Sequence, residues 1–127
     1  KFSKTIINEV SPFIDITHDT KILEIGSGPS GGITYLNSNN KHAIDPLEDY
    51  FSTRKQWIAQ RDKRVKYYSG KGENLPFKDS FFDLVIIDNV LDHCETPIDV
   101  LNEINRVITF GGIIFIRQNI YNYFSLQ

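Results

Sequence analysis

The chain has 127 residues, of which 40% are apolar and 24% charged, and we expect one globular domain over residues 1–127. Its longest apolar runs, Leu84–Ile87 and Ile113–Ile116, are far shorter than the roughly 20 residues of a membrane helix, which excludes a membrane protein. A single cysteine, Cys94, favours a reducing, cytoplasmic location, and a net charge of −2 supplies no general attraction for nucleic acid.

The first half of the chain alternates helical and strand-like segments. Apolar residues recur at helical spacing from Phe2 to Ile14, where Pro12 ends or kinks the helix. Lys21–Ile25 predicts a strand that stops at glycines. Three segments follow: a short helix at Ile33–Leu36, a strand at His42–Asp45, and a helix at Leu47–Gln60 with Tyr50, Phe51, Trp57 and Ile58 inward.

The second half continues this alternation. After a strand at Val65–Ser69 and a loop at Gly70–Ser80, the apolar run Phe82–Ile87 is typical of a strand covered on both faces. Thr96 and Pro97 are the N-cap and first residue of a helix, which Gly111 and Gly112 end before a fifth strand at Ile113–Arg117. The predicted apolar stripe of this helix is Ile98, Leu101, Ile104, Val107 and Ile108.

Strands separated by helices predict an open, mostly parallel α/β sheet with helices on both faces. Only Gln118–Gln127 follows the fifth strand, so we expect the sheet to be truncated there. The chain contains no methionine and begins inside amphipathic sequence. We therefore expect a fragment or processed form of a longer protein.

The clearest motif is a glycine-rich loop between the first strand and the short helix after it. Gly26-Ser27-Gly28-Pro29-Ser30-Gly31 has the spacing G-x-G-x-x-G, and Asp45 closes the next strand nineteen residues after Gly26. Glycines admit a ligand close to the backbone, helix N-terminal N–H groups face it, and the acid accepts hydrogen bonds from ribose hydroxyls. The pattern predicts a nucleotide site, although a glycine turn that only permits tight strand–helix packing is the simpler alternative.

From Lys21 to Ile116 the chain resembles the class I S-adenosylmethionine-dependent methyltransferases of the small-molecule type. Ile22–Gly28 is similar to that family's first motif, in which an acid, here Glu24, stands two residues before the first glycine. Further matching segments follow in the family's order: Gly72–Phe77, Phe81–Val85, Asn89–His93, Arg106–Ile108 and Gly111–Gly112. The resemblance implies a Rossmann-like fold, S-adenosylmethionine as cofactor, and transfer of its methyl group to an unidentified small-molecule acceptor.

The resemblance also implies a role for each matching residue. Gly26 and Gly28 would contact the methionine moiety, and Glu24 would brace that loop and the amine. Asp45 would hold the ribose, and Asn89 would offer its main-chain carbonyl to the ammonium group. The implied cofactor-binding residues are Glu24, Gly26, Ser27, Gly28, Asp45, Pro46, Gly72, Glu73, Asn74, Leu75 and Asn89.

Around the adenine the chain departs from the family. The resemblance implies that Glu73 and Asn74 lie beside the adenine and that Leu75 packs on it. Relatives often have an acid two residues before the Glu73 position, where this chain has Lys71, and a proline where it has Phe110. Adenine recognition is therefore altered or rests on Glu73.

Other chemistry-bearing residues have simple alternatives. His93 is a candidate general base or a loop histidine bonded to backbone. Asp88, Asp92 and Glu95 match no calcium loop, so we expect an acidic solvated edge and no metal. Cys94 is interpreted as a small apolar side chain. We name no catalytic residue, because methyl transfer depends mostly on alignment and desolvation.

Two other functions remain open. The first is an NAD-type dehydrogenase, against which Glu24 and the loop Leu75-Pro76-Phe77 argue; the second is a non-catalytic binding module that keeps the fold. The segment Arg54–Lys66 holds six basic residues and one acidic residue. The simpler interpretation is a solvent-exposed helix face, and the alternative is a surface that binds RNA or phosphate.

Overall fold

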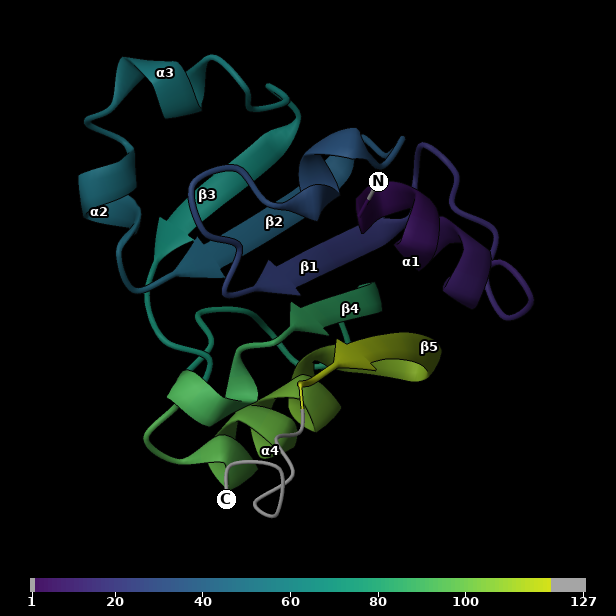
Figure 1. Cartoon of the computed structure of the whole chain (residues 1–127). Coiled ribbons are helices and arrows are strands. Elements are labelled where there is room, and N and C mark those ends of the chain that lie inside the picture. The colour runs from purple at the N-terminus through teal and green to yellow at the C-terminus, as the bar shows by residue number, and fades with distance from the viewer. Residues whose placement is uncertain (1, 120–127) are drawn as a thin grey trace, which may run out of the picture.

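The computed structural model describes residues 2–119, which form a five-stranded sheet flanked by short helices (Figure 1). The elements in chain order are α1 (Phe2–Val10), β1 (Lys21–Ile25), η1 (Gly32–Tyr35), β2 (Asn40–Asp45), α2 (Glu48–Phe51), α3 (Lys55–Ile58), β3 (Val65–Ser69), β4 (Phe82–Asp88), η2 (Leu91–His93), α4 (Pro97–Val107) and β5 (Ile108–Arg117).

The sheet has the order β3-β2-β1-β4-β5, and every neighbouring pair of strands is parallel. The chain builds outward from β1 to β3 and then crosses to the other side of β1 to form β4 and β5 (Figure 1). The strand order therefore reverses between β1 and β4, at the place where open α/β sheets bind ligands. The predicted fold class is confirmed, and the loops after β1, β2 and β4 meet at one edge of the sheet.

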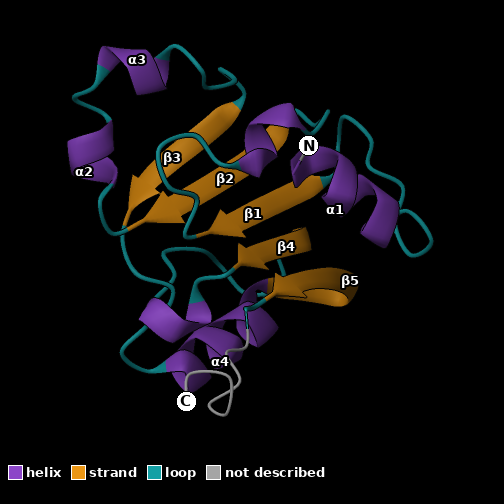
Figure 2. Ribbon diagram, viewed as in Figure 1, coloured by secondary structure: helices purple, strands orange, loops and turns teal. Residues whose placement is uncertain are grey.

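Helices cover both faces of the sheet, as predicted. Successive strand residues point to opposite faces. On one face Ile22 of β1 packs with Ile6 and Val10 of α1, in a cluster that also includes η1. On the other face Leu23 packs with Val100 of α4. Figure 2 shows α1 and α4 on opposite sides of the strands, which explains why the central strands are apolar at nearly every position.

The predicted single helix Leu47–Gln60 is wrong. The segment forms two one-turn helices, α2 and α3, separated by Arg54 in an extended conformation. The Thr53 hydroxyl donates to the Tyr50 carbonyl at 2.7 Å, so a local bond competes with a continuing helix. Tyr50 and Ile58 are 48% and 45% exposed instead of facing inward.

The helix α4 begins at Pro97, as predicted, although the Thr96 side chain makes no capping bond. Its buried face is narrower than the predicted stripe, because Ile98 and Leu101 are exposed. The buried residues recur at positions i, i+4 and i+7, namely Val100, Ile104 and Val107. The sequence pattern was helical but did not show which part of the stripe contacts the sheet.

The predicted start of the fifth strand is also wrong. β5 begins at Ile108, directly after α4, and Gly111 lies inside the strand with φ +79°. The pairing of β5 with β4 shifts register between Phe82 and Leu84. A glycine with positive φ is typical of a β-bulge, so the glycine pair bends the strand and does not end the helix.

Candidate functional site

A cavity of about 450 Å³ lies at the carboxyl ends of β1, β2 and β4. Seven of the predicted cofactor-binding residues line it: Gly26, Gly28, Asp45, Pro46, Gly72, Glu73 and Asn89. Four others, Glu24, Ser27, Asn74 and Leu75, do not line it. The fold thus brings together residues from four separate segments of the chain.

The glycine loop forms the floor of the cavity. Gly26 and Gly28 have φ of +70° and +66°, a conformation that favours glycine. A Cβ on Gly26 would lie 2.5 Å from a methyl of Val90, so this glycine permits close packing of the loop after β4. A Cβ on Gly28 would meet no atom within 4 Å, so the backbone there opens on free space. The two glycines therefore serve different purposes, one packing and one ligand access.

Glu24 lies behind the glycine loop and is 4% exposed. Its Oε1 accepts a hydrogen bond from the Ile33 N–H at 3.0 Å, and a Cβ on Gly31 would approach the same oxygen to 2.5 Å. Burial raises the pKa of Glu24 to about 8, the Ile33 bond opposes this, and the charge of Asp88 adds to it. The side chain braces the segment between β1 and η1, and burial favours its neutral form.

Asp45 joins the end of β2 to the glycine loop. Its Oδ2 accepts from the Gly28 N–H at 3.0 Å and its Oδ1 from the Leu47 N–H at 2.9 Å. Each oxygen of a carboxylate has a further lone pair, so both can still accept from a ligand. Ser27, beside the cavity, donates its hydroxyl to the Gly28 carbonyl at 3.2 Å.

The loop after β3 contributes Gly72 and Glu73 to the cavity, whereas Leu75 is 3% exposed and belongs to the core on the α4 face. The Glu73 Oε2 accepts from the N–H groups of Glu95 and Thr96 at 3.0 and 3.3 Å. Glu73 therefore ties the loop after β3 to the two residues that precede α4. The sequence did not indicate this contact, because the two segments are over twenty residues apart.

The loop after β4 forms the opposite wall. Asn89 has φ +59°, uncommon for a residue other than glycine, and its neighbour Val90 packs against Gly26. His93 and Cys94 line the cavity, and the Cys94 Sγ donates to the Val90 carbonyl at 3.4 Å. Burial raises the pKa of the Cys94 thiol. Within residues 2–119 no three His, Cys, Asp or Glu side chains are grouped so as to hold a metal.

Several cavity-lining residues were not predicted. They are Ile25, Ile44, Leu47, Gly70, Lys71, Asp88, Val90, His93, Cys94 and Glu95. Gly70 directly follows β3, and Leu47 is the second residue after β2. Their position shortly after the carboxyl end of a parallel strand is the sequence feature that could have predicted their place in the cavity.

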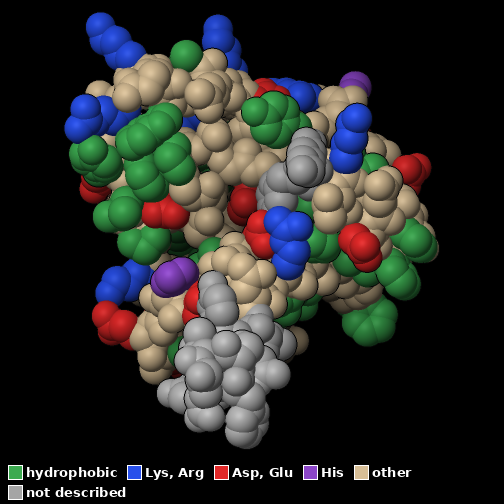
Figure 3. All heavy atoms as spheres, in the orientation of Figure 1, with side chains coloured by type: hydrophobic (Ala, Val, Ile, Leu, Met, Phe, Trp, Pro, Cys, Tyr) green, Lys and Arg blue, Asp and Glu red, His purple; other side chains and the backbone are tan. Residues whose placement is uncertain are grey.

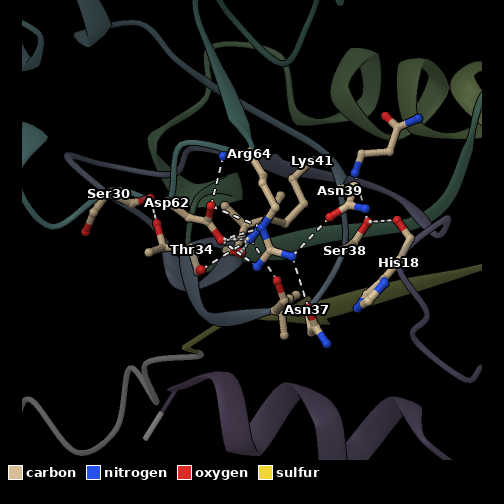
Figure 4. A network of polar contacts seen from close by, with 12 residues as sticks. His18, Ser30, Thr34, Asn37, Ser38, Asn39, Lys41, Asp62 and Arg64 are labelled. Atoms are coloured by element: carbon tan, nitrogen blue, oxygen red, sulfur yellow. Dashed lines mark hydrogen bonds and ion pairs between the residues drawn. The ribbon is translucent and has the colours of Figure 1, made fainter.

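A buried lysine, Lys41 of β2, holds the end of η1 (Figure 4). Its side chain is fully buried, and its Nζ donates to the carbonyls of Ile33, Thr34 and Leu36 at 2.7–3.2 Å. Asp62 is its ion-pair partner at 2.9 Å. Lys41 thus satisfies the last carbonyls of η1, the segment that Glu24 holds at its start.

Two cations of the basic segment 54–66 form ion pairs with carboxylates of the protein. Arg61 pairs with both carboxylate oxygens of Glu48 and lies 3.7 Å from the ring centre of Tyr67. Arg64 pairs with Asp62 and, through the hydrogen bonds from its guanidinium, holds the pKa of that carboxyl well below its usual range. Figure 3 shows Lys and Arg side chains projecting from the edge that carries α3, as expected for a solvated face.

The chain matches the Methyltransferase domain family over residues 23–116. It is 44% identical over 59 residues to protein MJ1123 of Methanocaldococcus jannaschii, covering 46% of this chain and 28% of that protein. It is 22% identical over 121 residues to the thiol S-methyltransferase TMT1B of Rattus norvegicus, covering 92% of this chain and 50% of that enzyme.

The chain thus spans half or less of these curated relatives. A SAM-dependent methyltransferase structure from Aquifex aeolicus superposes with a TM-score of 0.64 at 19% identity, covering 84% of this chain and 58% of that one. No helix within residues 2–119 is long and apolar enough to cross a membrane. A family match over more than half of the chain confirms the predicted resemblance: the protein belongs to the methyltransferase domain family, within the class I S-adenosylmethionine-dependent methyltransferases.

Proposed function

We propose that this chain binds S-adenosylmethionine in the 450 Å³ cavity and is the cofactor-binding domain of an enzyme that methylates a small-molecule acceptor. The observation that carries the proposal is the open space over the Gly28 backbone, at the switch point of the sheet. The cavity volume lies within the 300–1,000 Å³ typical of cofactor sites. The cofactor would supply a methyl group on a positively charged sulfur.

The described residues fit this cofactor at three places. Gly26 and Gly28 would meet the methionine moiety with their backbone, and Asp45 retains lone pairs for the ribose hydroxyls. Asn89, at the end of β4, would offer its main-chain carbonyl to the ammonium group. Glu24 lies behind the glycine loop, and its carboxylate would lie near the ammonium group.

At the adenine end the fit rests on fewer residues. Gly72 and Glu73 line the cavity and would flank the ring, with Pro46 on the other side. Asn74 and Leu75 remain predictions that receive no support from the cavity lining, since Leu75 lies in the core. Ser27 would act through the glycine loop.

We further propose a small-molecule acceptor, a single domain and a cytoplasmic location. The thiol S-methyltransferase relative supports the first, and the single cysteine Cys94 supports the last. The residues of this chain would orient the acceptor and exclude water, which is most of what direct methyl displacement needs from a protein. His93 lines the cavity and would be the candidate to take a proton from an acceptor.

Ligand-induced thermal stabilisation tests the cofactor. At 100 times its dissociation constant a ligand stabilises the folded state by about 2.7 kcal/mol. S-adenosylhomocysteine should raise the melting temperature and NAD should not. The opposite result would support a dehydrogenase, and binding without methyl transfer to small thiols or amines by the full-length enzyme would support a non-catalytic module.

Asp45→Ala tests the ribose assignment. Hydrogen bonds to a charged group contribute about 1.5–3 kcal/mol, so the Kd for S-adenosylhomocysteine should rise by about tenfold or more. Asp49→Ala, in the exposed part of α2, is the matched control. An unchanged Kd in a folded Asp45 variant would refute the assignment.

A further inference from the structure

We infer that Gln118, the residue after β5, is a positioning residue for the cofactor site, because its carboxamide holds Asn89 and the loop after β4. The inference rests on the proposed function, in which the Asn89 main-chain carbonyl receives the ammonium group. Gln118 itself does not line the cavity, so it would act only through its neighbours. Neither the sequence motifs nor the family resemblance pointed to it.

The contacts converge on the Asn89 side chain. Its Oδ1 accepts from the Gln118 Nε2 at 3.2 Å and from the Asn119 N–H at 3.0 Å. Its own N–H donates to the Arg117 carbonyl at 2.6 Å. Residues 117–119 therefore bind both the backbone and the side chain of Asn89, the residue that follows β4.

The other end of the same carboxamide reaches further into the loop. The Gln118 Oε1 accepts from the Leu91 N–H at 3.2 Å. Beside it, the Arg117 guanidinium makes two bonds of 2.7 and 2.8 Å to the Asp88 carboxylate. One side chain thus bridges positions 89 and 91, and an ion pair fixes position 88.

This bridge matters because of the conformation it holds. Asn89 has φ +59°, which residues other than glycine adopt rarely and keep only where their surroundings impose it. The next residue, Val90, packs where a Cβ of Gly26 would lie. If Asn89 changed to a negative φ, its carbonyl would turn and Val90 would press against the glycine loop. The shape of the cavity therefore depends on the hydrogen bonds that Gln118 makes to this loop.

Gln118→Ala should selectively weaken ligands that carry the amino-acid group. The Kd for S-adenosylhomocysteine should rise about tenfold, the loss expected for one or two hydrogen bonds. The Kd for 5′-methylthioadenosine, which has the adenosine but no amino-acid group, should not change. Gln60→Ala, at an exposed position after α3, is the matched control and should leave both values unchanged.

Gln118→Glu provides a second test if the alanine variant does not fold. It keeps an acceptor for the Leu91 N–H but loses the donor to Asn89, so the same selective loss is expected. A wild-type Kd for S-adenosylhomocysteine in either folded variant overturns the inference, as does an equal loss for both ligands. Absence of binding by the wild-type chain would instead refute the proposed function.

Discussion

Replacing Glu24 by glutamine should remove a pH dependence from cofactor binding. Burial raises the pKa of Glu24 to about 8, so the free protein at pH 7 carries this residue mostly protonated. A bound ammonium group would favour the carboxylate form. Binding below pH 8 must therefore release the Glu24 proton.

The size of the effect follows from this pKa. Each pH unit below 8 adds about 1.4 kcal/mol to the free energy of ionising Glu24. The Kd for S-adenosylhomocysteine should consequently rise about fivefold between pH 8 and 7 and about ninefold between pH 7 and 6. At pH 7, calorimetry in buffers of different ionisation enthalpy should detect release of about 0.9 proton per ligand.

The control variants separate this effect from other titrations. Glu24→Gln keeps an oxygen that can accept from the Ile33 N–H but has no proton to release, so its Kd should be nearly constant between pH 6 and 8. Glu9→Gln, on the exposed side of α1, should retain the wild-type slope. A flat profile in the wild type, or the same slope in Glu24→Gln, would refute the reasoning.

Three further predictions concern stability. Lys41→Met should lower the free energy of unfolding by at least about 1–3 kcal/mol, the cost of leaving a buried carbonyl without its donor, whereas exposed Lys63→Met should change it little; urea denaturation compares the two. Burial lowers the pKa of His42 from 6.5 to about 4, so the folded state should lose up to about 1.4 kcal/mol per unit as the pH falls through that window. Denaturation at pH 7 and 5 should show a smaller difference for His42→Gln than for the wild type. Gly31→Ala, at φ +77° and against the Glu24 oxygen, should lower the melting temperature, and an unchanged value would show that the loop can shift.

Local sequence was enough to predict the strands, the glycine loop and much of the candidate site. The strands are apolar because helices cover both faces, and a strand followed by Gly26 and later by Asp45 is a local pattern. In a parallel sheet, all residues at the carboxyl ends of strands share one edge. Residues just after the strands therefore fall together at this edge, although the seven cavity-lining residues that were predicted came from the family resemblance.

The tertiary structure decided the contacts between distant segments. Lys41 lies outside the predicted strand His42–Asp45, yet it is buried in β2 because the carbonyls of η1 and the carboxylate of Asp62 converge on it. Glu73 is predicted as a ligand contact and also accepts from two N–H groups just before α4, and no sequence pattern indicates Gln118. Side-chain periodicity reports which face of an element is buried. It does not report which polar group from another segment meets that face, since that partner depends on strand order and on register.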